Sequence, residues 1–105
     1  MGWVSIIHRA TGALLFLSIP LLLYLLGLSL SSAEGFARVT AVVGSLPFRL
    51  VGLLLIWAVM HHLLAGLRFL LIDLDLGVDL SKAKASALGV IVGGVTLAIV
   101  GGLLW

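Results

Sequence analysis

Three long apolar runs alternate with short polar segments along this chain. The runs free of Asp, Glu, Lys and Arg cover residues 10–33, 50–67 and 85–105, with lengths of 24, 18 and 21 residues. A helix needs roughly 20 apolar residues to cross a bilayer core about 30 Å thick. The pattern therefore predicts three membrane-spanning helices. They are expected over about residues 4–31, 47–72 and 82–105.

The polar segment after the first run predicts a short helix at the membrane surface. Ser31 is followed three residues later by Glu34, which is the spacing of a capping box at a helix start. Gly44 is a stop signal for this helix, and Ser45 with Pro47 is a start signal for the second span. The expected fold is thus all-α, a three-transmembrane-helix bundle with a short interfacial helix between the first two spans.

Composition supports one membrane-anchor domain over residues 1–105, with Ser81 expected to cap the third span. Hydrophobic residues make up 63% of the chain and charged residues 10%. Soluble domains carry about 25% charged residues, so a soluble enzyme with its own globular domain is excluded, as is a disordered chain. The absence of cysteine excludes disulfides and zinc–cysteine sites within the chain. The net charge of +2 includes no basic cluster of the kind that binds nucleic acid.

Basic residues near the span ends predict the orientation in the membrane. Four basic residues lie on the side of the N-terminus, namely Arg9, Arg68, Lys82 and Lys84. Two lie on the other side, namely Arg38 and Arg49. We therefore expect a cytoplasmic N-terminus and a C-terminus outside. A cleaved secretory signal is disfavoured, because the first apolar run is longer than the usual signal core of about 7–15 residues.

A polar cluster opens the first span. On a helix Ser5 and Arg9 lie one turn apart, and His8 and Gly12 flank the same face. An arginine guanidinium offers a fixed fork of donors, which suits an anionic or carbonyl-bearing ligand. The alternative is a membrane anchor in which His8 and Arg9 reach out to lipid headgroups. The residue types alone leave both interpretations open.

Two adjacent histidines lie inside the second span. On a helix His61 and His62 point about 100° apart, so one flat ligand does not easily use both. Ala58 and Gly66 lie one turn on either side of His62 and leave room for a large planar group, whereas Trp57 flanks His61. Imidazole is a common axial ligand of haem iron. The alternative for each histidine is a hydrogen bond to another helix. If His62 is a ligand, a partner would supply the second one.

Glycines mark one face of the third span. Gly89 and Gly93 have the small-xxx-small spacing of membrane helix packing faces. We expect this face to pack against a helix, either within the chain or in another membrane subunit.

Three stretches of the chain resemble the cytochrome b556 subunit of succinate dehydrogenase, the larger of two membrane anchors of succinate:quinone oxidoreductase. The first signature is Ser5-x-x-His8-Arg9-x-Thr11-Gly12. The second signature is His62-x-x-x-Gly66-Leu67-Arg68-Phe69-x-x-x-Asp73. Residues 28–36 also resemble the outer loop of bacterial members. The resemblance covers nearly the whole chain, and two spaced motifs make it specific.

The resemblance implies roles for particular residues. His62 would be one axial ligand of haem b, and the smaller anchor subunit would provide the other. His8 and Arg9 would lie near the haem propionates. Ser5, Arg9 and Asp73 would border the quinone site, beside the iron–sulfur subunit.

The resemblance also implies a place in a larger enzyme of the bacterial cytoplasmic membrane. The partners would be the second small anchor, the iron–sulfur subunit and the flavoprotein subunit, with ubiquinone or menaquinone as substrate. This chain would hold no dicarboxylate catalytic site. A haem-free anchor of a fumarate reductase-type complex is the nearest alternative. A small multidrug transporter is disfavoured, because it needs about four spans and an acidic residue within the membrane.

Two departures from the family pattern stand out. Phe69 occupies a position where many members have a second histidine. Members also carry a longer segment before the first motif, so either the contact with the soluble subunits is shorter here or the sequence is truncated.

Overall fold

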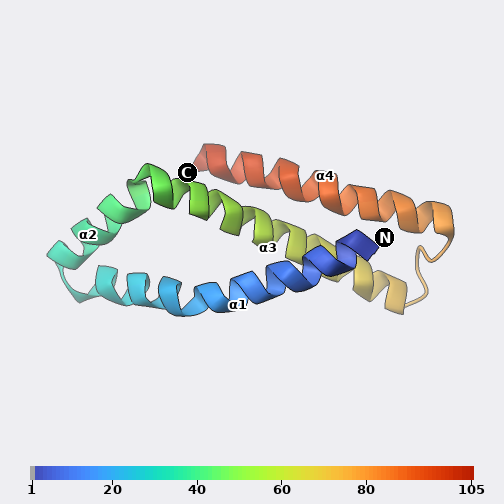
Figure 1. The fold of residues 1–105 in the computed structure, drawn as a ribbon, viewed down its shortest axis with the longest axis horizontal. Helices are drawn as coiled ribbons and strands as arrows, with labels where there is room; N and C mark the ends of the chain where they lie inside the picture. The colour runs from blue at the N-terminus through green and yellow to red at the C-terminus, as the bar shows by residue number, and fades with distance from the viewer. Residues whose placement is uncertain (1) are drawn as a thin grey trace.

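The computed structural model describes residues 2–105, and every regular element in that range is a helix (Figure 1). The elements are α1 (Gly2–Ser31), α2 (Ala33–Gly44), α3 (Leu46–Asp73) and α4 (Leu80–Leu104). The helices α1, α3 and α4 are long and apolar enough to cross a membrane. The prediction of an all-α bundle with three spans and one short helix is confirmed.

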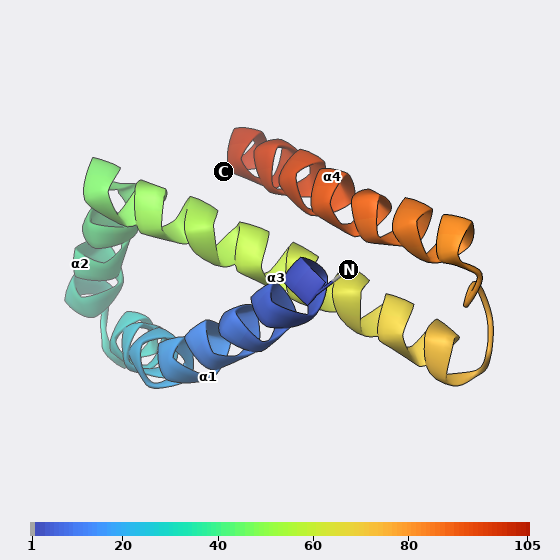
Figure 2. The ribbon, with the colours of Figure 1, turned by 45° about the vertical axis from the view of Figure 1, so that its right-hand side comes forward.

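The helix α3 is the centre of the bundle (Figures 1 and 2). The helix α4 runs back beside it in the opposite direction. The N-terminal part of α1 crosses α3 closely, and the two helices then diverge until α2 bridges their far ends. This crossing brings the polar start of α1 against the second half of α3.

Serine hydroxyls define the start of α2 one residue later than the sequence predicts. The N-cap is Ser32, whose Oγ accepts a hydrogen bond from the backbone N–H of Gly35 at 2.9 Å. Ser31 instead ends α1, and its hydroxyl donates to the carbonyl of Leu28 at 2.7 Å. The prediction that Ser31 is the cap was wrong, because its hydroxyl is already used by the helix that precedes it.

The other predicted caps have mixed outcomes. Ser45 is the N-cap residue of α3, and a proline occupies the first turn, as predicted. The N-cap residue of α4 is Asp79, so the prediction that Ser81 caps this helix was wrong. The backbone reverses before α4 at Asp75 and Gly77, which have φ angles of 59° and 69°. Aspartate and glycine are among the residues that adopt this left-handed region most readily.

Small side chains line the contact between α3 and α4. The buried residues of the two helices are Gly52, Ala58, His61, Ala65 and Arg68 on α3 and Ala87, Val90, Gly94 and Ala98 on α4. Such residues let two membrane helices approach closely. Gly94 lies directly against His61, and Gly93 against Leu64, but Gly89 faces open space. Within this chain, Gly93 therefore packs against α3, whereas Gly89 does not take part in the helix contact.

Candidate functional site

Two histidine rings lie face to face where α1 crosses α3. The ring centroids of His8 and His62 are 4.1 Å apart, and the ring planes differ by 9°. The ring of Phe69 meets His8 edge-on at 5.3 Å. Residues 61 positions apart in sequence thus form one aromatic group, with both imidazoles at the crossing of two membrane helices.

Hydrogen bonds orient the imidazole of His62. Its Nδ1 lies 3.1 Å from the backbone carbonyl oxygen of His8 and 3.3 Å from the hydroxyl of Thr11. A carbonyl oxygen only accepts, so this bond requires the proton on Nδ1, and in the neutral imidazole Nε2 then carries a lone pair. Metal-binding histidines characteristically donate their second ring N–H to such a carbonyl. His62 therefore has the tautomer and the support that a metal ligand requires.

The hydroxyl of Thr11 is part of the same support. Thr11 is buried and donates to the backbone carbonyl of Ile7 at 2.8 Å, within the first helix. Its oxygen can then accept the Nδ1 proton of His62 as a second partner. The α1 backbone and one α1 side chain thus hold an α3 imidazole.

Two glycines, which have no side chain, face the two imidazoles. A Cβ atom at Gly12 would lie 2.9 Å from Cε1 of His62, closer than real contacts allow. Gly66 faces the ring of His8, where a Cβ would lie 3.6 Å from Nε2, an ordinary contact. A groove of about 450 Å³ opens beside the rings and is lined by both histidines, Gly66, Phe69 and three leucines. This groove is apolar apart from the imidazoles, and it suits a large planar group.

His61 points to the other side of α3. It is 1% exposed and lies against Gly94 of α4, with its ring centroid 5.5 Å from that of Trp57. Neither ring nitrogen has a hydrogen-bond partner among residues 2–105. The predicted alternative of a bond to another helix therefore describes His62, which bonds to α1, and does not describe His61.

The other candidate residues lie nearer the surface. Arg9 is exposed, and its Nε donates to the backbone carbonyl of Ser5 at 3.5 Å. Asp73 is the last residue of α3 and is also exposed. Among residues 2–105 it forms no ion pair with Arg9 or with any other basic residue. The chain by itself thus leaves most donors of Arg9 and the carboxylate of Asp73 free to meet other groups.

Comparison with known proteins decides the family. The family described as succinate dehydrogenase/fumarate reductase transmembrane subunit matches residues 1–101. The chain belongs to this family. It is 32% identical over 107 residues to the succinate dehydrogenase cytochrome b556 subunit of Coxiella burnetii, covering all of this chain and 86% of that protein. It is 36% identical over 95 residues to the subunit of the same name from Paracoccus denitrificans, covering 90% of this chain and 73% of that protein.

Membership in this transmembrane subunit family confirms the resemblance based on the two motifs, and three apolar helices agree with it. The relatives are subunits of succinate dehydrogenase by name, and the chain is an integral membrane protein.

The sequence motifs gave no role to Thr11, although the first motif contains it. Its signal was a lone hydroxyl three residues after His8, which reaches a second helix only through the fold.

Proposed function

We propose that this chain is the haem b-binding anchor subunit of a succinate:quinone oxidoreductase and that it helps to form the quinone-reduction site. One observation carries the proposal. Nδ1 of His62 is occupied by the carbonyl of His8, and Nε2 is left to ligate iron. His8 stacks parallel beside His62, and His61 faces α4, so the second axial ligand would come from the smaller anchor subunit.

Other residues at the start of α1 would serve the bound groups. His8 and Arg9 would lie near the haem propionates, whose negative charge a guanidinium complements. Ser5 and Arg9 would donate hydrogen bonds to a quinone carbonyl oxygen as negative charge develops on it. When bound, haem b supplies a reversible one-electron store beside this site.

Asp73 is the proposed proton donor or water-ordering group of the quinone site. Quinone reduction takes two electrons and two protons, and the electrons come through the flavin and iron–sulfur centres of other subunits. The exposed carboxylate at the end of α3 would exchange protons with the aqueous phase. The dicarboxylate chemistry would take place in the flavoprotein subunit. The quinone would be ubiquinone or menaquinone.

We place the subunit in the bacterial cytoplasmic membrane with its N-terminus cytoplasmic and its C-terminus outside. The excess of basic residues on the N-terminal side supports this orientation. It puts Ser5, Arg9 and Asp73 on the side where the iron–sulfur subunit would dock. The flavoprotein subunit would belong to the same complex.

A visible spectrum tests the proposed haem. Membranes or purified complex containing the wild-type chain are expected to show a b-type absorbance band after reduction with dithionite. A haem-free fumarate reductase-type anchor would reduce quinone but lack this band. Absence of the band from an active, fully assembled complex would contradict the proposed ligand role of His62.

Gly12→Ala is expected to lower the haem content of the complex. The added methyl group would overlap Cε1 of His62 at 2.9 Å and push the imidazole away from its position. Haem per complex, measured by the pyridine haemochrome, should fall to less than about half. Gly27→Ala is the matched control on the same helix, because nothing lies within 4 Å of the added atom. Equal haem in the two variants would show that the position of His62 does not govern haem binding.

A further inference from the structure

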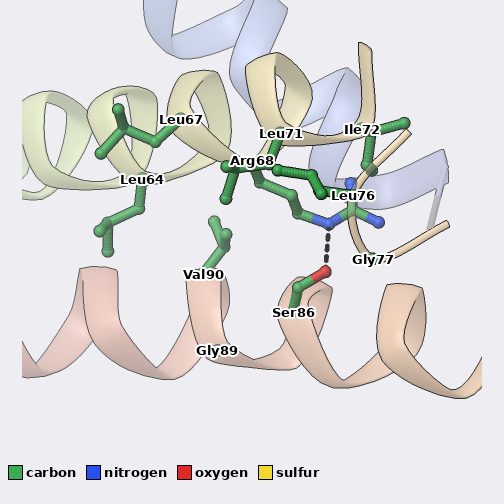
Figure 3. A pocket seen from close by; sticks show the side chains of 10 residues that line it. All are labelled: Leu64, Leu67, Arg68, Leu71, Ile72, Leu76, Gly77, Ser86, Gly89 and Val90. Atoms are coloured by element: carbon green, nitrogen blue, oxygen red, sulfur yellow. Dashed lines mark hydrogen bonds between the residues drawn. The ribbon is translucent and has the colours of Figure 1, made fainter. Parts of the chain in front are cut away.

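Arg68 is a charged side chain buried between α3 and α4. It is 8% exposed and points to α4, whereas His62 points to α1. Its Nε donates to the hydroxyl of Ser86 at 2.9 Å, and its Nη2 donates to the backbone carbonyl of Ala83 at 3.1 Å (Figure 3). Both acceptors are uncharged, so these contacts orient the guanidinium without neutralising it.

No carboxylate within residues 2–105 pairs with Arg68. Three aspartates lie at this end of the molecule, namely Asp73, Asp75 and Asp79. Asp79 pairs with Lys82 at 3.5 Å, and none of the three forms an ion pair with Arg68. A buried charge without a counter-charge is costly, because the protein interior solvates it poorly. An anion from outside the described residues would therefore stabilise the buried guanidinium.

A groove of about 330 Å³ runs between α3 and α4 at this point (Figure 3). Arg68 and Ser86 provide its polar end, and the rest of the lining is mainly aliphatic. The aliphatic residues are Leu64, Leu67, Leu71, Ile72, Leu76 and Val90. Gly89 contributes only backbone, and a Cβ there would have nothing within 4 Å, so the groove is open along α4. One end thus suits an anion, and the remainder suits a hydrocarbon chain.

The depth of the groove agrees with a lipid headgroup. Arg68 lies five residues before the end of α3, which is about 7.5 Å at the rise of an α-helix. The 28 residues of α3 span about 42 Å, close to the thickness of a bilayer with its headgroup layers, so Arg68 would lie near the border between headgroups and hydrocarbon core. A free anion, or a carboxylate from a soluble subunit, would neutralise Arg68 but leave the aliphatic lining unfilled. A phosphodiester attached to an acyl chain satisfies both ends.

We propose that this groove binds one anionic phospholipid. Its phosphate accepts hydrogen bonds from the guanidinium of Arg68 and from the hydroxyl of Ser86. One acyl chain lies along the aliphatic lining past Gly89. The lipid supplies the counter-charge for Arg68 and fills the groove between the last two spans. This proposal concerns the α4 side of α3 and does not depend on haem binding at His62.

Native mass spectrometry of the delipidated complex containing the full chain tests the proposal. The probes are phosphatidylglycerol and phosphatidylcholine with identical acyl chains, and glycerol 3-phosphate as the headgroup alone. We expect one tightly bound phosphatidylglycerol per copy of this chain and much weaker binding of the other two. Arg68→Gln should weaken that binding roughly tenfold, as expected for loss of a charge-assisted hydrogen bond. Gly89→Leu should also weaken it, by filling the groove.

Lys82→Gln is the matched control, since Lys82 is an exposed cation at the same end of the molecule. It should leave the binding unchanged. The proposal is overturned if Arg68→Gln binds phosphatidylglycerol like the wild type, or if phosphatidylcholine binds equally well. Equal weakening by Lys82→Gln would also overturn it, as would full competition by glycerol 3-phosphate. If Arg68→Gln does not assemble, Gly89→Leu and Arg68→Lys decide: binding must fall in the former and largely persist in the latter.

Discussion

Replacing His62 with alanine is expected to remove nearly all haem b absorbance from the assembled complex. The substitution deletes the Nε2 lone pair that would bind the iron, and none of the other imidazoles described here lies in an equivalent position. The measurement is the dithionite-reduced minus oxidised spectrum, normalised to the amount of purified complex. Retention of the wild-type absorbance would refute the assignment of His62 as a ligand.

His61→Leu is the control for this experiment. It alters the adjacent histidine, which is buried against α4 with both nitrogens unpaired among residues 2–105. Haem content should stay at the wild-type level. The melting temperature of the complex should not fall, because an unsatisfied buried polar group costs about 1–3 kcal/mol and leucine removes it. Loss of haem in both variants would indicate a general disturbance of α3 and not the loss of a ligand.

Arg9→Gln is expected to slow succinate:quinone reductase activity roughly 100-fold, the effect of removing one strong donor to a developing oxyanion. The guanidinium is exposed at the start of α1, and only Nε is engaged by the backbone of Ser5. Oxidation of succinate with a soluble dye as electron acceptor should be unchanged, because that reaction bypasses the quinone. Both rates are measured on the same purified complex.

Arg49→Gln provides the comparison for Arg9→Gln. Arg49 is also an exposed arginine, but it lies near the start of α3. Asp73, which is proposed to border the quinone site, is the last residue of the same helix. Its replacement should leave both activities unchanged. A parallel loss of dye and quinone activity in Arg9→Gln would point to faulty assembly with the soluble subunits and would contradict a direct role at the quinone.

Local sequence patterns predicted the helices well and their caps less well. The apolar runs determine the spans, because each must match the thickness of the bilayer regardless of what packs beside it. Caps depend on single hydroxyl groups. Ser31 and Ser32 are adjacent and chemically alike, and the first bonds back into α1 while the second caps α2. Only the relative position of the two helices separates these roles.

Helical periodicity alone separates the directions of His61 and His62. Their 100° separation is a property of any α-helix, and it requires the two imidazoles to face different neighbours. Which neighbours these are depends on the rotation and crossing of the helices. The structure places α1 beside His62 and Gly94 of α4 beside His61.

The sequence by itself determined that this protein has three membrane spans, one short helix between the first two, a few polar residues near the span ends and two histidines inside the second span. These features follow from hydropathy and local periodicity. Only the tertiary structure decided that His8 stacks on His62, that Thr11 supports it, and that Arg68 is held by Ser86. Each of these contacts joins two helices. Such contacts depend on where one helix crosses another, and side-chain packing sets that geometry while hydropathy along a single helix does not.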